Sequence, residues 1–314
     1  MSFDRTTIKS GPAILTWNGG TMYFAKGLTA EEGFETFDVT TDVFAGADKR
    51  RGSLLGTIKG TPSGQWKNLG VWFPWLGAAR GTRMHGASDK TAVIKWLDGD
   101  IWTYHNAALQ DMPDLILSST KTIMEGGITL ECRTKNNTDP TAAASFVTRT
   151  TGSFTDTSFD WDEVPTQVYA YAWGGSSPWD SFATREGVKI KAKAKWSEIP
   201  TDELGVIEKE LDMLEVTASF VPMGITQANL DAKLAMQNSA SAARGARMSA
   251  LAEDLIITGT GVYIAMRSAF MRKLPMQSGT DGKGRIGEIE AVSTLGVTTG
   301  AAVAMLFVGT EEPA

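Results

Sequence analysis

Cysteine and histidine are scarce in this chain. Its 314 residues include one cysteine, Cys132, and two histidines, His85 and His105. A single cysteine excludes an internal disulfide framework, and two histidines leave little for a His- or Cys-based metal site. We therefore expect no metal and no cofactor.

Long apolar runs and an excess of positive charge are also lacking. No stretch approaches the roughly 20 apolar residues of a membrane-spanning helix. The first ten residues lack the apolar core of a signal peptide, so we expect a protein made in the reducing cytoplasm, with no membrane partner. The formal charge of −6 and the pI near 5.1 oppose a general nucleic-acid-binding surface, which would normally be basic.

The composition favours strands and turns. There are 33 glycines but only 11 prolines, and 42% of the residues are hydrophobic. Thr, Val, Trp and Phe in short runs are typical of strands, and a chain of this length is usually split between two domains. The sequence therefore predicts a mostly β protein with two folded units.

An internal repeat is the most informative feature. Residues 78–84 read Ala-Ala-Arg-Gly-Thr-Arg-Met and residues 242–248 read Ala-Ala-Arg-Gly-Ala-Arg-Met, with one mismatch in seven positions. Each copy is preceded by a Pro-x-Gly segment, Thr61-Pro62-Ser63-Gly64 before the first and Val221-Pro222-Met223-Gly224 before the second. Each copy is followed by an apolar residue and a proline, Met112-Pro113 after the first and Leu274-Pro275 after the second. Self-similarity at a constant offset, here about 160 positions, indicates two units with one plan.

The repeat sets the expected domains: a first β-domain at 1–150, a linker or insertion at 151–186 and a second β-domain at 187–314. Residues 138–158 are rich in Thr, Ser and Ala, and Gly174-Gly175-Ser176-Ser177-Pro178 is a turn cluster. Each domain is expected to be a β-barrel or sandwich flanked by one helix. The helices are predicted over 68–79 and 227–238, the second capped by Thr226.

Turn signals and alternation predict the strands. Asn18-Gly19-Gly20 should join strands 13–17 and 21–26, and Asp98-Gly99-Asp100 should join 91–97 and 101–109. In the second half, Gly259-Thr260-Gly261 should join 255–258 to 262–270, and the closing strand is predicted at 285–292. Alternating residues predict further strands at 36–43, 128–133 and 214–221, with Cys132 in the core and Glu131 and Arg133 on the opposite face.

Motifs that could carry chemistry have simpler interpretations. The glycine-rich segment 279–284 lacks the spacing of a phosphate loop and leads into a strand, so a hairpin or loop tip is favoured. His105 fits a hydrogen-bonded strand histidine better than a ligand or a general base. The acidic residues of 156–163 fit no calcium loop and are interpreted as a solvated loop. We expect no catalytic residue and no enzyme activity.

The order of several motifs resembles a known family. Gly60-Thr61-Pro62-Ser63-Gly64-Gln65-Trp66, Trp72-Phe73-Pro74, Asp89-Lys90, Asp98-Gly99-Asp100 and Met112-Pro113-Asp114-Leu115 together resemble tail tube proteins of long-tailed siphophages and prophages. The resemblance covers roughly 9–134 and, more faintly, the second half, which lacks the tryptophans and the Phe-Pro pair. It implies small β-barrels or sandwiches, six to a ring. A duplicated chain resembles the branch in which three subunits close a pseudo-sixfold ring.

The resemblance also implies function and partners. The chain would self-assemble into homotrimeric rings stacked into a tube, a passive conduit for genome ejection. It would form in the bacterial host cytoplasm and end in the tail of the virion, with terminator, tape measure and distal tail proteins as neighbours. Double-stranded DNA would pass through the lumen without specific contact. The alternatives are a carbohydrate- or protein-binding β-sandwich module, a head-tail connector or decoration protein and, last, a β-rich hydrolase that uses an acidic pair.

Two sets of basic residues stand out, the arginines as candidates for contacts between subunits and a lysine face for its bearing on DNA. The repeat places Arg80, Arg83, Arg244 and Arg247 at matching positions, where arginine can bridge to carboxylates of a neighbouring domain. Lys189, Lys191, Lys193 and Lys195 alternate with apolar residues and so share one face of a strand. Because a lumen lined by lysine would grip DNA, we expect this face outside the lumen or against acidic groups such as Asp38 and Asp42.

Overall fold

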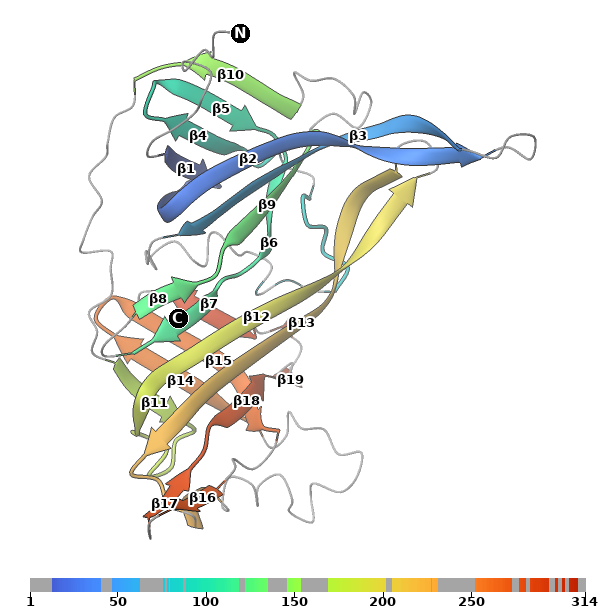
Figure 1. The fold of residues 1–314 in the computed structure, drawn as a ribbon. Helices are drawn as coiled ribbons and strands as arrows, with labels where there is room; N and C mark the ends of the chain where they lie inside the picture. Colours follow the sequence, from blue (N-terminus) through green and yellow to red (C-terminus); the bar gives the residue numbers. More distant parts are fainter. Residues whose placement is uncertain are drawn as a thin grey trace.

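The computed structural model is mostly β, with its strands gathered into two groups that lie one above the other (Figure 1). It describes residues 13–40, 47–62, 76, 78, 80–86, 89–118, 122–134, 146–153, 169–201, 205–226, 228–230, 252–272, 277–280, 283–293, 297–298, 301–302 and 305–309. We call the part up to residue 153 the first half and the part from residue 169 the second half.

The strands of the first half pair in a closed circuit. The pairing order is β5-β4-β1-β2-β3-β9-β6, and β5 leads into β6 after only two residues, so the two ends of the path meet. A short strand, β10, flanks β5. The bounds are β1 Ala13–Trp17, β2 Gly20–Thr40, β3 Ala47–Pro62, β4 Ala92–Trp96, β5 Asp100–Tyr104, β6 Ala107–Asp111, β9 Ile128–Arg133 and β10 Val147–Thr151.

The second half follows the same circuit. The order is β11-β14-β15-β18-β13-β12, and an isolated bridge between Tyr171 and Phe182 links β11 back to the residue before β12. A further strand, β21 (Leu306–Gly309), pairs with β15. The bounds are β11 Tyr169–Trp173, β12 Ala183–Thr201, β13 Gly205–Met223, β14 Glu253–Gly259, β15 Val262–Met271 and β18 Ile289–Ser293. β11 therefore lies within the range that the sequence assigned to a linker.

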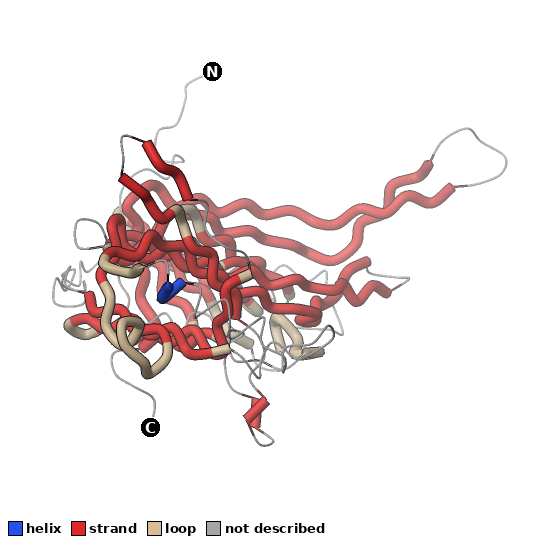
Figure 2. Tube along the Cα trace, turned by 90° about the horizontal axis from the view of Figure 1, so that it is seen from below, coloured by secondary structure: helices blue, strands red, loops and turns tan. Residues whose placement is uncertain are grey.

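Two long hairpins, β2–β3 and β12–β13, reach out on the same side of the molecule (Figure 2). Thr36 pairs with Arg51 in the first hairpin, and Trp196 pairs with Leu211 in the second. Each residue of the second pair thus lies 160 positions after its counterpart in the first. Each hairpin has three register shifts, and the one between Phe34 and Thr36 falls at the same place as the one between Lys195 and Trp196. The two hairpins thus share one register.

Two buried tryptophans fix the first strand of each circuit. Trp17 ends β1 and Trp173 ends β11, and each is 1% exposed. The indole Nε1 of Trp17 donates to the carbonyl oxygen of Ala107 (3.0 Å), and that of Trp173 donates to the carbonyl oxygen of Ala269 (3.3 Å). A buried indole N–H needs such an acceptor, and both halves supply it from the strand across the circuit.

The strand that closes each circuit carries a residue in the left-handed region, at the break between β5 and β6 in the first half and at a bulge inside β15 in the second. Asn106 has φ 43° and Ser268 has φ 46°. In each half an aspartate accepts the backbone N–H of that residue with one carboxylate oxygen and binds the preceding cationic or imidazole side chain with the other. The trios are Asp89, His105 and Asn106, and Asp254, Arg267 and Ser268. The aspartate offsets the cost of a non-glycine residue at positive φ.

Short hairpins complete the fold. β7 (Asp114–Leu117) and β8 (Thr122–Glu125) come from the first half, but β7 pairs with β12 of the second half. β16 (Gln277–Thr280) and β17 (Lys283–Ile286) form a two-stranded sheet at the far end of the second half (Figure 1). A second two-stranded sheet joins β19 (Val297–Thr298) and β20 (Ala301–Ala302).

Several predicted elements are confirmed and some are corrected. The Asn18-Gly19 turn and the strands it joins are present, and Cys132 is fully buried. The strand predicted over 101–109 breaks at 105–106, and that predicted over 285–292 divides into β17 and β18. Of the helix predicted at 227–238 only 228–230 are described as helix, with Asn229 N–H donating to the Thr226 hydroxyl. Most of the helix predicted at 68–79 lies outside the described residues.

Candidate functional site

The two halves meet where residues 80–85 lie along the outer part of β13. The N–H of Gly81 donates to the carbonyl oxygen of Leu211 (2.8 Å), and the N–H of Leu211 donates back to Thr82 (2.9 Å). Met84 N–H donates to the Lys209 carbonyl oxygen (2.8 Å). The first copy of the repeated segment therefore pairs with β13 through backbone hydrogen bonds and an isolated antiparallel bridge between Arg83 and Glu210. We call residues 80–85, β9 and residues 206–212 the joint.

The arginines of the first repeat segment bind carboxylates at the joint. Arg80 lies 2.7 Å from Asp212, and Arg83 lies 3.9 Å from Glu210. The side chains of Arg80 and Arg83 are 82% and 65% exposed, and exposed pairs of this kind contribute only about 0–1 kcal/mol each. Their partners belong to the second half of the same chain. Arg244 and Arg247 lie outside the described residues, so contacts between subunits stay a prediction for all four.

His85 is the buried anchor of the joint. Its side chain is 0% exposed, and Nδ1 lies 2.9 Å from Glu208 Oε1. The same oxygen accepts the backbone N–H groups of His85 (3.2 Å) and Lys209 (2.9 Å). One carboxylate of the second half therefore holds both the backbone and the ring of a first-half residue.

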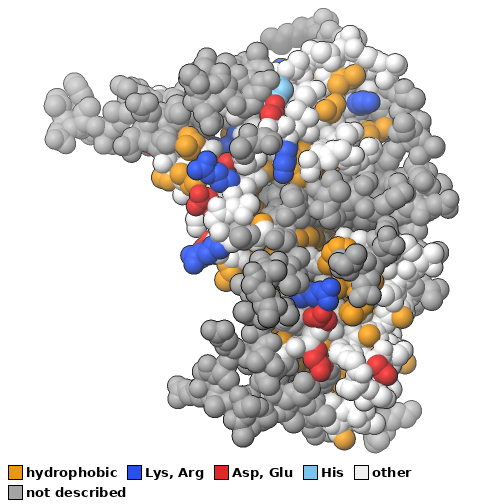
Figure 3. Space-filling model, turned by 180° about the vertical axis from the view of Figure 1, so that it is seen from behind, with side chains coloured by type: hydrophobic (Ala, Val, Ile, Leu, Met, Phe, Trp, Pro, Cys, Tyr) orange, Lys and Arg blue, Asp and Glu red, His pale blue; other side chains and the backbone are white. Residues whose placement is uncertain are grey.

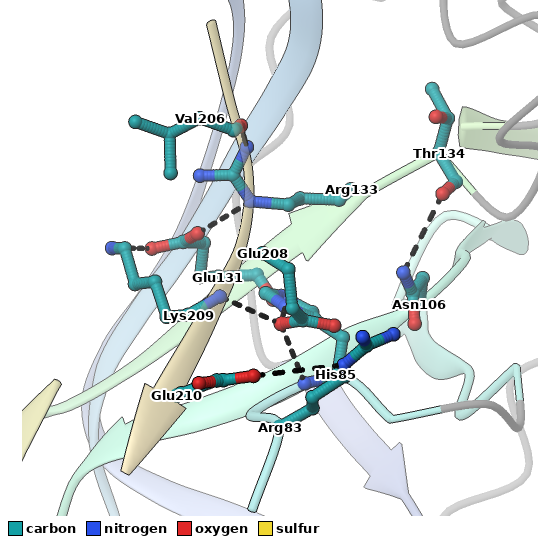
Figure 4. Close-up of polar contacts among 10 residues, drawn as sticks. All are labelled: Arg83, His85, Asn106, Glu131, Arg133, Thr134, Val206, Glu208, Lys209 and Glu210. Carbon is teal, nitrogen blue, oxygen red and sulfur yellow. Dashed lines mark hydrogen bonds and ion pairs between the residues drawn. The ribbon is translucent and has the colours of Figure 1, made fainter. Parts of the chain in front are cut away.

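Glu131 carries a second, almost fully buried charge cluster (Figure 4). It accepts from Arg133 Nε (2.8 Å) and forms an ion pair with Lys209 Nζ. Arg133 also donates to the carbonyl oxygen of Val206. The side chains of Glu131 and Arg133, both on β9, are 8% and 5% exposed. Their partners Lys209 and Val206 come from β13, so this cluster also joins the two halves.

The pKa values of the two glutamates reflect these contacts. Burial alone would raise the pKa of Glu208, but hydrogen bonds from His85 and from the Lys209 N–H bring it below the ordinary value. Burial would likewise raise the pKa of Glu131, and Arg133 and Lys209 outweigh it and lower the pKa. Both carboxylates are therefore held as anions in the folded chain.

Sequence reasoning missed the buried part of the joint. Alternation along β9 placed Glu131 and Arg133 opposite Cys132, on a face expected to be exposed, yet the three residues are 6%, 4% and 0% exposed. Both faces of β9 are covered because β13 of the second half lies over the polar one. The one available signal was the alternation of charge in Glu208-Lys209-Glu210, which usually indicates a solvated face.

The lysine face of β12 is also engaged by acidic side chains. Lys189 and Lys191 lie 3.0 and 3.5 Å from Asp114, which the first half supplies at the start of β7. Lys195 lies 3.7 Å from Asp212. Asp38, suggested as a partner, instead pairs with Lys49 at 3.0 Å, and Asp42 lies outside the described residues.

A triad-like arrangement around His105 has a structural counterpart. His105 lies 2.8 Å from Asp89 and 3.4 Å from the Thr148 hydroxyl, which is the order of an acid, a base and a nucleophile. The second half places Arg267 and Asp254 in the same arrangement, and arginine is not a proton acceptor at ordinary pH. The role common to both halves is to hold the next residue, Asn106 or Ser268, at positive φ.

The remaining motifs add no chemistry within the described residues. Thr280 pairs with Lys283, so the glycine-rich segment forms the predicted hairpin. Cys132 is fully buried, and burial raises the pKa of its thiol, which keeps it protonated. No cluster of three or more metal-ligating side chains occurs in the described part of the chain. The acidic residues of 156–163 lie outside it, and no helix described is long and apolar enough to cross a membrane.

No protein-family model matches this chain, and no curated protein sequence matches it.

Proposed function

We propose that this chain is the repeated subunit of a phage tail tube, with trimeric rings of pseudo-sixfold symmetry stacked into a passive conduit for DNA. The observation that carries the proposal is the head-to-tail relation of the two halves. The first half supplies β7 to the sheet of the second half and binds its β13 through residues 80–85. A unit that binds a copy of itself by two different surfaces forms rings when the rotation closes.

Matching strand registers support the view that the halves are copies of one β-barrel unit. The β2–β3 and β12–β13 hairpins agree at an offset of 160. The pairs Ala107–Cys132 and Ala269–Ser293 agree at offsets of 162 and 161, since 269 − 107 = 162 and 293 − 132 = 161. The buried tryptophans and the aspartate-held residues at positive φ also recur. Agreement in so many independent contacts is expected of a duplication and not of two unrelated domains.

Apolar side chains exposed on the long hairpins suit contact with further copies. Phe34 on β2 is 54% exposed, and Ile207 and Met213 on β13 are 38% and 54% exposed. Large apolar side chains that face water on a projecting arm are typical of an interaction surface. We place these arms against the neighbouring ring, where stacking would cover them.

The distribution of charge suits passage of DNA without tight binding. Three of the four β12 lysines have acidic partners within 3.7 Å. On the face seen from behind, most of the described basic side chains lie near acidic ones (Figure 3). A paired lysine releases fewer counterions on meeting a phosphate and so contributes less to DNA affinity.

Electron microscopy of the purified protein tests the proposal. We expect hollow tubes built of stacked rings, with mass measurements giving trimers as the smallest assembled species. A protein that stays monomeric at every concentration, and forms no tubes, would sink the proposal. Monomers stabilised by a sugar or a peptide would favour the binding module. Single closed rings that never stack would favour the connector or decoration protein.

A further inference from the structure

The contact between β7 and β12 is a strand addition within one chain. Leu117 pairs with Val188, and Leu115 pairs with Ile190, and all four side chains are fully buried. Gly187 has φ +85°, and a Cβ there would clash with the carbonyl oxygen of Leu117. The close approach of β7 therefore requires glycine at this position of β12.

The second half carries the counterpart of the docking hairpin. β16–β17, like β7–β8, consists of two four-residue strands. β7–β8 lies between Met112-Pro113 and the strand Ile128–Arg133, and β16–β17 lies between Leu274-Pro275 and the corresponding strand Ile289–Ser293. Asp114 and Gln277, the first residues of the two hairpins, are 163 positions apart, since 277 − 114 = 163. Within the described residues, β7–β8 lies in a nine-stranded sheet, whereas β16–β17 pairs only with itself.

The first half carries the counterpart of the acceptor strand. Residues 28–30 of β2 lie 160 positions before residues 188–190 of β12, the stretch that receives β7. One edge of β2 pairs with β3 and the other edge pairs with β1, but the pairing with β1 ends at Tyr23. At residues 28–30, therefore, none of the described strands covers the edge that faces β1. Gly27 stands at the position of Gly187, and no atom of the described residues lies within 4 Å of a Cβ built on it.

We propose that the β16–β17 hairpin of one copy of this chain adds, in the next copy, to the edge of β2 that no described strand covers. The register follows from the contact within the chain: Thr280 opposite Leu28, Gly279 opposite Thr29 and Ser278 opposite Ala30. The inference rests on the proposed assembly of this chain with itself, and it names the surfaces that join one copy to the next. Three strand additions within chains and three between chains would then alternate around a ring of three copies.

The contact between copies differs in chemistry from the contact within the chain. Leu115 and Leu117 are replaced by Ser278 and Thr280, and Asp114 is replaced by Gln277. Backbone hydrogen bonds therefore carry the contact between copies, with less apolar burial and without the ion pairs of Asp114. A weaker contact of this kind is suited to a subunit that stays soluble until it assembles.

Substitution of Gly27 tests the docking site. The φ of Gly27 lies outside the left-handed region, and its surroundings in the described chain are open, so Gly27→Val should leave the thermal unfolding midpoint unchanged. The added side chain would meet the incoming hairpin of the next copy, so tube assembly should be lost. Gly175→Val is the control, because Gly175 lies in the turn after β11, outside both the docking stretch and the projecting arms, and no described atom lies within 4 Å of a Cβ built there. Assembly of Gly27→Val at the wild-type concentration would overturn the proposal.

A disulfide cross-link tests the register. Thr29→Cys combined with Gly279→Cys should give covalent species that end at trimers on oxidation, because directly opposed strand residues lie close enough to bridge. The natural Cys132 is fully buried and should not react. Gly33→Cys with Gly279→Cys, out of register, should give no ladder. Tubes that form without any cross-link would overturn the strand addition alone, whereas a wild-type chain that never assembles would overturn the proposed function with it.

Discussion

Replacing Glu131 by glutamine should destabilise the folded chain by uncoupling its two halves. The substitution keeps the shape of the side chain but leaves Arg133 and Lys209, with side chains 5% and 13% exposed, facing a neutral amide. Removing one partner of a buried ion pair typically costs about 3–5 kcal/mol. We expect about 3 kcal/mol, the lower end, because Lys209 keeps some contact with water.

Thermal unfolding followed by circular dichroism measures the effect. For a chain of this size each 1 kcal/mol corresponds to roughly 2 °C, so Glu131→Gln should lower the midpoint by roughly 6 °C. Glu210→Gln is the control: its partner Arg83 is exposed and 3.9 Å away, so that change should cost at most about 0.5 kcal/mol. A double-mutant cycle with Lys209→Met isolates the coupling across the joint. Equal midpoints for Glu131→Gln and Glu210→Gln would refute the assignment of this cluster as the buried link.

Three further outcomes are expected. Glu131 and Glu208 have lowered pKa values in the folded chain, so their contribution to stability is full above their ordinary pKa of 4.5 and is lost as the pH falls through the lowered values. Asp111, whose pKa is raised by burial, partly offsets this loss, and a urea midpoint that does not fall below about pH 4.5 would contradict the assignment. Trp17→Phe and Trp173→Phe each remove one buried N–H···O bond at equivalent places, so each should lower the unfolding free energy by about 1 kcal/mol; a large difference between them in urea titrations would argue against equivalent roles. Assembled tubes should bind duplex DNA weakly even at low salt, and tight binding with a steep salt dependence, measured by fluorescence anisotropy, would exclude a passive conduit.

Local signals carried much of the strand prediction. Asn18-Gly19 demanded a turn with both residues at positive φ, and they have φ 49° and 83°. The turn at Thr260-Gly261, which joins β14 to β15, was predicted in the same way. Short-range turn chemistry of this kind is readable because the conformations it requires are accessible to few residue types.

The residues at positive φ and the buried joint depended on contacts between distant parts of the chain. Asn106 separates β5 from β6 and Ser268 lies at a bulge in β15, and each is held by an aspartate, 17 and 14 positions away, respectively. Glu131 looked solvent-facing because its partner Lys209 lies 78 positions further along. A period-two pattern reports how one strand is covered by its own domain, and it carries no information about a second domain laid over the polar face.

Because β7 adds to the sheet of the second half, the chain divides differently by sequence order and by hydrogen bonding. By order along the chain, Asp114–Leu117 belongs with the first half, but by hydrogen bonding it belongs to the sheet of the second. A protease cut between 154 and 168 would therefore leave two fragments still held by a shared sheet and by the buried charges around Glu131. Conversely, the second half expressed alone would expose the edge of β12 with Val188 and Ile190 uncovered, a template for unwanted pairing. A fragment of the second half made for study should therefore include the hairpin at 114–125, although this hairpin belongs to the first half in sequence order.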